Sequence, residues 1–350
     1  MKNHLIIAAL LLGTTVAFAQ DVAPLDSDTE PDRVEWWQLE ETFGSVPEVP
    51  EDTTVGAVAK TLTNEYWRLL AEGYQQGAAT YGVKIDVQAA QSESDQLGQL
   101  AIAETMLSQG YDTLLVSPQS DANLQPAFEA TLGQDIPVVN VNDAVIPQAI
   151  QYVGNVQKQN GVRVANWFIE NYPDGGQVAV IEGQAGVYAA GQRTAGFTET
   201  VNEAGNFDVV ASVPADWSRQ TAFDQATTIL SQYPDLIGFY ANNDTMALGI
   251  VEAVKAAGRQ EGVKVFGTDG INDAYASILA GELTGTVDSF PVITGEVGME
   301  VALRVLGGQE IPRVVSTPQA LITTENYDRY KGDGVDPKAA LIEDAESESN

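Results

Sequence analysis

Three clusters of polar residues in this chain directly follow apolar runs. They are Asn142-Asp143 after residues 136–141, Asn243-Asp244 after residues 236–241, and Thr268-Asp269-Gly270 after residues 263–267. Apolar runs of this length are typical of buried parallel strands, and ligands of open α/β sheets bind just outside the carboxyl ends of such strands. The clusters therefore predict a polar site for a small molecule. Ordinary turn and helix-cap chemistry is the alternative for each cluster taken alone.

The first 19 residues have the features of a secretory signal peptide. Lys2 precedes an apolar core over residues 5–12, and Ala17-Phe18-Ala19 forms a small-x-small cleavage site before Gln20. An uncleaved membrane anchor is the alternative, although the core is short for a bilayer. We expect export and removal of this segment.

Export also limits the chemistry that the protein can perform. Cleavage removes His4, the single histidine, and the chain has no cysteine. A mature chain of this kind lacks the residues for a Ser-His-Asp triad, a cysteine nucleophile or a His/Cys zinc site. It also has neither a G-x-G-x-x-G loop after a strand nor a Walker lysine, so we expect no cofactor, no metal and no catalytic residues. Glycoside hydrolysis by two carboxylates is the enzymatic alternative.

The chain is strongly acidic, with 49 Asp and Glu against 17 Lys and Arg and a formal net charge of -32. Nucleic acids and anionic membranes repel such a chain, so we expect neither as a partner. Both ends are especially acidic. We predict an acidic linker over residues 20–53, within which residues 34–39 could dock as a short helix, and an acidic tail over residues 328–350. The part of the chain between these two ends is also acidic, which indicates a salt-adapted protein. The alternative is simply an acidic secreted protein.

Strands and helices alternate between the two acidic ends. The predicted strands are 55–59, 85–89, 113–116, 136–141, 177–182, 207–213, 236–241, 263–267 and 284–287. The predicted helices are 65–81, 97–109, 121–132, 160–171, 189–204, 221–232, 245–257 and 274–280. Repeated βαβ units imply parallel sheets with right-handed crossovers, and two successive series imply two similar lobes. The predicted fold class is therefore α/β with two Rossmann-like lobes.

Six ordered motifs in residues 54–327 resemble those of the ribose-type periplasmic sugar-binding proteins. They are Thr61–Trp67, Pro118–Ala122, Ile136–Val139, Pro214–Arg219, Asn243–Gly249 and Gly267–Gly270. The resemblance implies the type I fold of periplasmic binding proteins, in which three crossing strands join the lobes. It implies an N-terminal lobe of residues 54–155 plus 290–316 and a C-terminal lobe of 156–289 plus 317–327. The crossings would lie near Asn155, Ser289 and Thr317.

The resemblance also implies a function and a set of ligand-binding residues. Proteins of this type work in the periplasm and deliver a sugar to the permease of an ABC importer in the inner membrane, and some dock on a chemoreceptor. From the two-lobed architecture we expect a monomer. The implied ligand-binding residues are Asn64, Tyr66, Trp67, Asn142, Asp143, Arg193, Trp217, Asn243, Asp269 and Ser289. The aromatic residues would stack on the sugar ring and the polar ones would bind its hydroxyl groups, with Arg193 binding two at once. Core packing for the aromatic residues and a salt bridge for Arg193 are the structural alternatives. We expect Asp244 to cap the helix that begins near Thr245.

Two positions depart from the ribose-type pattern. Asn142-Asp143 stands where that pattern has Asp-Arg, and Ser289 stands where it has Gln. A cationic donor is thus replaced by an acidic acceptor, which favours a neutral monosaccharide or polyol other than ribose. One alternative is a periplasmic sensor subunit that presents a sugar or an autoinducer-2-like ligand to a chemoreceptor or histidine kinase. A transcriptional regulator of the same fold would need a DNA-reading helix pair where this chain has its signal peptide and acidic segment.

Overall fold

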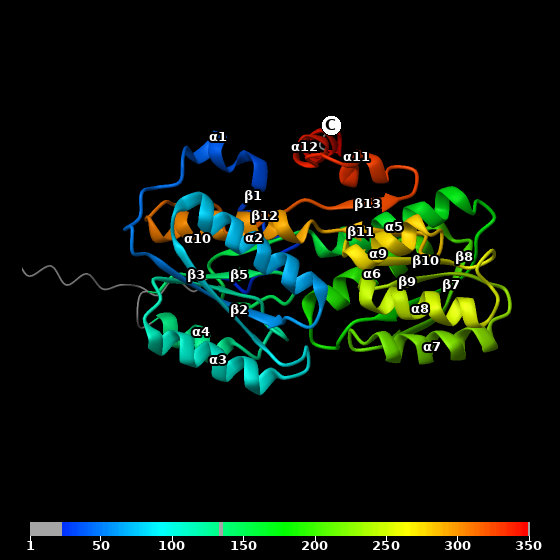
Figure 1. Ribbon diagram of the computed structural model, residues 1–350. Coiled ribbons are helices and arrows are strands. Elements are labelled where there is room, and N and C mark those ends of the chain that lie inside the picture. The colour runs from blue at the N-terminus through cyan, green and yellow to red at the C-terminus, as the bar shows by residue number, and fades with distance from the viewer. Residues whose placement is uncertain (1–22, 133–135, 349–350) are drawn as a thin grey trace, which may run out of the picture.

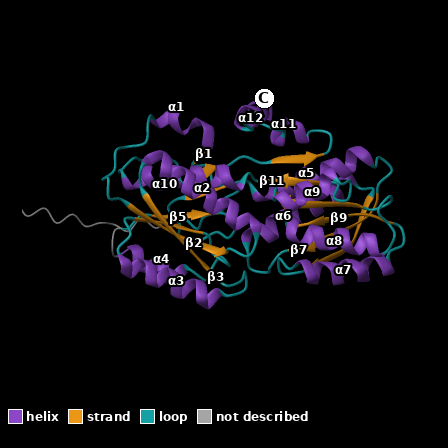
Figure 2. Cartoon of the chain, viewed as in Figure 1, coloured by secondary structure: helices purple, strands orange, loops and turns teal. Residues whose placement is uncertain are grey.

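The computed structural model of the protein describes residues 23–132 and 136–348, so the predicted signal peptide lies outside the described residues. Two α/β units lie side by side, each built on its own sheet (Figure 1). In each unit the strands lie between layers of helices (Figure 2). No helix in the described part of the chain is long and apolar enough to cross a membrane.

The first sheet has the strand order β1-β12-β6-β5-β4-β2-β3, and its neighbouring strands run parallel. The strands are β1 (Arg33–Glu35), β2 (Thr54–Thr61), β3 (Lys84–Ala90), β4 (Thr113–Val116), β5 (Val138–Val141), β6 (Tyr152–Gly154) and β12 (Val314–Ser316). The helices of this unit are α2 (Glu65–Tyr81), α3 (Gln96–Gln109), α4 (Gln125–Leu132) and α10 (Pro291–Leu306). Helices α2 and α10 pack so closely that a Cβ atom on Gly73 would lie 2.1 Å from the carbonyl oxygen of Val292.

The second sheet has the order β13-β11-β10-β9-β7-β8, and β13 alone among its described strands runs antiparallel to its neighbour. The strands are β7 (Gly176–Glu182), β8 (Phe207–Pro214), β9 (Leu236–Ala241), β10 (Lys264–Asp269), β11 (Gly285–Asp288) and β13 (Ala320–Thr323). The helices are α5 (Gln157–Asn171), α6 (Tyr188–Ala204), α7 (Arg219–Gln232), α8 (Asp244–Ala256) and α9 (Asn272–Leu279). Helix α5 packs on α6, and α7 packs on α8.

The described chain passes between the two units at three places. The first passage lies at Asn155 between β6 and α5, the second at Ser289 between β11 and α10, and the third at Thr317 between β12 and β13. All three residues are buried. Phe290, next to the second passage, has a left-handed backbone with φ of 46°.

The strands and helices predicted from the sequence are present, with shifts at their ends. The helix predicted over 121–132 begins at Gln125, and the strand predicted over 136–141 begins at Val138. Strands β1, β6, β12 and β13 were not predicted. Each has only three or four residues, which is too short to show an alternating pattern.

Residues 23–53 do not form the predicted acidic linker, and we call them the N-terminal strap. Strand β1 extends the first sheet beside β12, and η1 (Trp36–Gln38) and α1 (Leu39–Phe43) follow where a short helix was predicted. Leu25, Val34 and Leu39 are buried, which explains why an acidic segment packs on the molecule.

The strap touches both units. The backbone N–H of Val314 in the first unit donates to the carbonyl oxygen of Asp32 over 3.0 Å. The carboxylate of Asp28 accepts hydrogen bonds from the backbone N–H groups of Gln157 and Lys158, at 2.9 and 2.7 Å, at the start of α5. The strap therefore holds the start of the second unit against the edge of the first.

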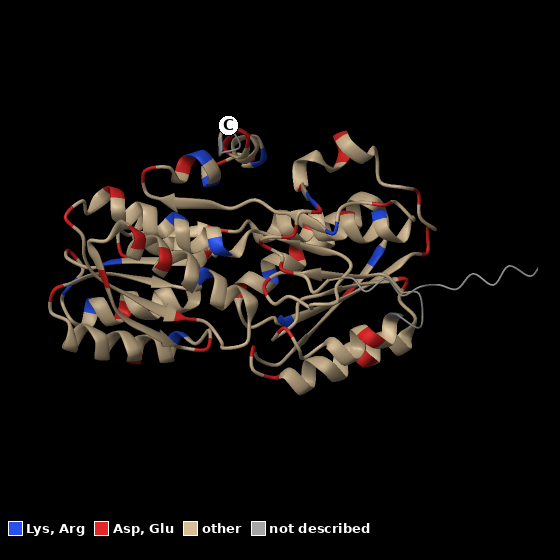
Figure 3. Ribbon diagram, turned by 180° about the vertical axis from the view of Figure 1, so that it is seen from behind, with Lys and Arg blue, Asp and Glu red and all other residues tan. Residues whose placement is uncertain are grey.

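The predicted acidic tail over 328–350 is also largely structured. It contains most of α11 (Tyr327–Lys331) and α12 (Lys338–Glu348). Leu341 is buried, and Lys338 forms an ion pair of 3.0 Å with Glu296 on α10. Helices α1 and α12 lie on the same side of the molecule (Figure 1), and Asp and Glu are spread over both units as well as over these terminal segments (Figure 3).

Candidate ligand-binding site

A small cavity lies between the two units, at the carboxyl ends of the strands. It is lined by Asn64, Tyr66, Trp67, Glu93, Asp143, Arg193, Trp217, Asn243 and Asp269. Eight of the ten residues that the sequence suggests for the ligand therefore come together here, and Glu93 joins them.

Asn64 and Trp67 are held in place at the start of α2. The Asn64 side chain caps this helix, because its Oδ1 accepts from the backbone N–H of Tyr66 over 3.0 Å. Its Nδ2 donates to Glu93 over 2.9 Å, and the Trp67 indole donates to the same Glu93 oxygen over 2.7 Å. Burial raises the pKa of Glu93, while these two hydrogen bonds and the Lys60 charge oppose that shift. Glu93 thus fixes the orientation of two cavity residues.

Lys60, like Glu93, is a residue of the site that the sequence analysis did not predict. It lies near the end of β2, is 1 % exposed, and places its Nζ 2.6 Å from Oδ1 of Asp143. The same ammonium lies 5.5 Å from the centre of the Trp67 ring and 5.6 Å from that of Trp217. A lysine inside an otherwise apolar run was the signal available in the sequence, because a buried lysine needs a partner.

Arg193 connects the cavity to the crossing segments. Its Nε donates to Gln157 over 2.9 Å and its Nη1 donates to the carbonyl oxygen of Asn242 over 2.7 Å. Nη1 also lies 3.7 Å from Oδ1 of Asp269. Burial raises the pKa of Asp269 well above its usual range, and the Arg193 charge opposes this rise. The salt-bridge alternative for Arg193 and its place in the cavity wall are therefore compatible.

Asn142 and Ser289 are the two expected residues that do not line the cavity. Both are fully buried behind it. The Asn142 amide donates to the hydroxyl of Tyr66 over 2.6 Å, and the backbone N–H of Ser289 donates to the carbonyl oxygen of Asp269 over 3.2 Å. They support cavity residues in this structure.

Several site residues have strained backbones. Asn142, Trp217 and Asp269 have φ angles of 33°, 63° and 138°. Such conformations cost free energy in residues other than glycine, and they concentrate at functional sites.

Asp244 does not cap α8, contrary to our expectation. Asn243 is the cap, because its Oδ1 accepts from the backbone N–H of Met246 over 2.9 Å. Asp244 is fully buried and accepts from the N–H groups of Gly270 and Ile271, at 2.8 and 3.1 Å, and from Thr286 at 2.7 Å. Burial raises its pKa to about 6. Its role is to hold the loop that follows Asp269.

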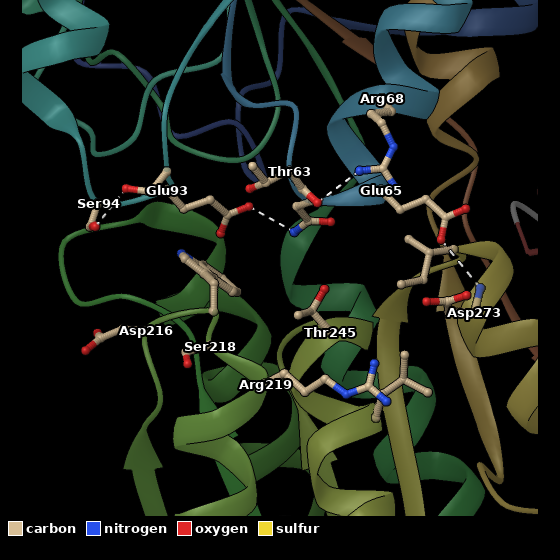
Figure 4. A pocket seen from close by; sticks show the side chains of 15 residues that line it. Thr63, Glu65, Arg68, Glu93, Ser94, Asp216, Ser218, Arg219, Thr245 and Asp273 are labelled. Carbon is tan, nitrogen blue, oxygen red and sulfur yellow. Dashed lines mark hydrogen bonds between the residues drawn. The ribbon is translucent and has the colours of Figure 1, made fainter.

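The units are closed on one another around the cavity. Figure 4 shows the mouth of the cleft, with Glu65 and Glu93 on one side and Asp216, Ser218 and Arg219 on the other. Glu65 of the first unit accepts from the Asn272 side chain of the second over 2.7 Å. A ligand in the cavity would therefore be enclosed by both units.

Comparison with known proteins identifies the family. Residues 55–310 match the model of the periplasmic binding protein domain. The chain is 35 % identical over 253 residues to the D-allose-binding periplasmic protein of Escherichia coli, covering 70 % of this chain and 81 % of that protein. It is 31 % identical over 289 residues to the D-ribose/D-allose-binding protein of Pseudomonas aeruginosa, covering 79 % of this chain and 90 % of that protein.

A solved structure supports the same relationship. The ABC transporter periplasmic solute-binding protein of Actinobacillus succinogenes, determined with bound D-allose, superimposes with a TM-score of 0.76 at 29 % identity. The match covers 80 % of this chain and 100 % of the other. The predicted fold class, two Rossmann-like lobes of the type I architecture, is confirmed. The chain belongs to the family of the periplasmic binding protein domain.

Proposed function

We propose that the protein is exported to the periplasm, captures a monosaccharide or polyol between its lobes, and delivers it to the permease of an ABC importer. The observation that carries this proposal is the placement of Trp67 and Trp217, from opposite units, around the Lys60 ammonium at 5.5 and 5.6 Å. Indole faces stack on the C–H faces of sugars, and the surrounding polar groups suit hydroxyl groups. The Trp217 indole nitrogen is buried and finds no hydrogen-bond partner among the described residues, so it is available to a ligand oxygen.

The charges of the cavity favour a neutral ligand. Lys60 pairs with Asp143, and Arg193 lies beside Asp269. Glu93 adds a further carboxyl group to the wall. An anionic ligand would therefore meet carboxylates without an unpaired cation to offset them, whereas sugar hydroxyls can donate to the carboxylates and accept from Lys60 and Arg193.

D-allose is the first ligand to test. Two relatives are named for D-allose, and the similar solved structure holds D-allose. The cavity is walled by residues of both units, which suits a single monosaccharide better than an oligosaccharide. All ten ligand-binding residues suggested by the sequence remain candidates, eight through direct contact and Asn142 and Ser289 through support of the wall.

We propose that the lobes, residues 54–155 with 290–316 and residues 156–289 with 317–327, move as bodies about the three crossings. The interlobe hydrogen bond between Glu65 and Asn272 would break on opening. Small-angle scattering should show a smaller radius of gyration when a sugar that binds is added. An unchanged radius with a confirmed ligand would contradict this hinge motion.

We also propose that the protein performs no chemistry on its ligand, is a monomer and binds no nucleic acid. Presentation of the ligand to a chemoreceptor or histidine kinase is the alternative role, and it has less support because the named relatives are binding proteins, several of them for ribose import.

A thermal-shift screen tests the ligand class directly. The mature protein would be screened with D-allose, D-ribose, other hexoses and pentoses, alditols and inositols, together with amino acids and organic anions. We expect the melting temperature to rise with a neutral sugar or polyol, because a ligand that binds only the folded state stabilises it. A rise with amino acids or organic anions alone would contradict the sugar assignment.

A further inference from the structure

A second cavity lies behind the crossings, between the two terminal segments of the chain. The strap contributes Trp36 and Trp37, the crossings contribute Val156 and Thr317, and α12 contributes Leu341. Its described lining residues include none of those that line the cleft cavity. Most of them lie outside residues 55–310, the part that matches the family model, so this cavity is distinct from the sugar site of the family.

Three buried polar atoms of this cavity wall lack hydrogen bonds. They are Nε1 of Trp37, Oγ1 of Thr317 and Nε2 of Gln319, and none has a partner among the described residues. Thr317 is only 4 % exposed. Native proteins rarely leave buried polar groups unpaired, so water or a bound molecule must supply partners for these three atoms. Two of the atoms can only donate, which requires a ligand with acceptor oxygens.

The rest of the wall defines the class of that ligand. Trp36, Pro318 and Leu341 give it an apolar surface, and indole rings pack on the C–H faces of a sugar or polyol. Glu35 and Asp344 add carboxylates beside Arg163, so the wall does not favour an anion. We propose that this cavity is a second binding site, for a neutral sugar or polyol rich in oxygen acceptors.

The position of the site couples it to the hinge. Val156 follows the first crossing residue, and Thr317 is the third. Rotation of one lobe against the other changes the distance between these residues and the strap, so the affinity of this site depends on whether the cleft is open or closed. Linkage then requires that its occupant changes the affinity of the cleft by the same factor.

Indole N–H resonances in a nitrogen–proton correlation spectrum can report both sites at once. The chain has five tryptophans, of which Trp217 reports the cleft and Trp37 the second cavity. Their signals would be assigned with Trp37→Phe and Trp217→Phe. D-allose, myo-inositol, sorbitol, glycerol and trehalose would be titrated separately into the full mature chain.

We expect at least one of these probes to shift the Trp37 signal saturably. The ligand concentration at half-saturation, called the midpoint below, should differ between the Trp37 and Trp217 signals. Thr317→Val should raise the Trp37 midpoint several-fold and change the Trp217 midpoint less. This substitution removes no hydrogen bond found among the described residues, so folding should be kept, and Gln319→Met provides a second test. Thr105→Val, an exposed change on α3, is the matched control and should move neither signal.

Three outcomes would overturn the proposal. One is a Trp37 signal that none of the probes moves. Another is a shift that rises linearly without saturation, which would show a solvent effect only. The last is a Trp37 midpoint that always equals the Trp217 midpoint and is unchanged by Thr317→Val, which would show that Trp37 only senses closure of the cleft.

Discussion

The Lys60 ammonium lies 2.6 Å from the Asp143 carboxylate, and both side chains are buried at the cleft. The pair joins the end of β2, the strand that precedes α2 with its Tyr66 and Trp67, to the segment after β5. Neither charge is well exposed to water, and each therefore depends on the other.

Replacing Lys60 by Met should destabilise the protein by about 3 kcal/mol or more, because it leaves the Asp143 charge buried without its partner. The double variant Lys60→Met with Asp143→Asn should recover much of that loss. Urea unfolding of the three variants and the parent measures the coupling. Additive losses from the two single changes would show that the pair makes no specific contribution.

The buried carboxyl group of Asp244 should make stability depend on pH. Its pKa in the folded protein is about 6, above the ordinary value of 3.8, so the folded state binds more protons between these values. The free energy of unfolding should therefore fall as pH rises from about 4 to about 6, by about 3 kcal/mol for this group, and stay low above that range.

Asp244→Asn should remove this component. The amide oxygen can still accept from the backbone N–H groups of Gly270 and Ile271, and the amide nitrogen can donate to Thr286. The difference in unfolding free energy between variant and parent, measured from pH 4 to 7, should grow with pH. A constant difference would contradict the assignment.

The N-terminal strap should stabilise the closed structure through Asp28. Asp28→Ala removes the acceptor of two backbone N–H groups at the start of α5, which should cost about 1 kcal/mol, as for other helix caps. Asp235→Ala, at an exposed acidic residue, makes the same change of net charge and is the control. Equal melting temperatures for the two variants would show that the strap contact contributes nothing.

High salt should stabilise the protein. The formal charge is -32, and salt weakens the repulsion between the many carboxylates of both units. The melting temperature should rise from low to molar salt in sodium chloride. A flat or falling melting temperature would remove the interpretation of salt adaptation.

The central fold could be predicted because each long apolar run is followed by polar or capping residues, as at Asn142, Asn243 and Asp269. Lys60 and Glu93 escaped prediction because a charged residue in a strand or loop is usually on the surface. Only the closed structure shows that Lys60 is buried and that the half-buried Glu93 lines the cavity. Motif position also does not reveal which way a side chain faces, which is why Asn142 and Ser289 lie behind the cavity.

The prediction of an acidic linker and an acidic tail at the two ends of the chain was wrong for a related reason. Their Pro, Asp and Glu content is typical of linkers. A few widely spaced apolar residues anchor them, including Val34 and Leu341, and their partners are distant in the sequence. Composition averages over a segment and cannot register such contacts.

Calorimetric titration of the mature protein with D-allose, beside the variant Asp269→Ala, tests the central claim most directly. We predict one sugar bound per chain in the cleft with high affinity, and a loss of about ten- to a hundredfold in Asp269→Ala, about 1.5 to 3 kcal/mol, because a buried acceptor of ligand hydroxyls is removed. Asp269→Asn, which keeps the shape of the side chain, controls for the strained backbone at this residue. Unchanged affinity in both variants, or binding of amino acids or organic anions without any sugar, would contradict the account.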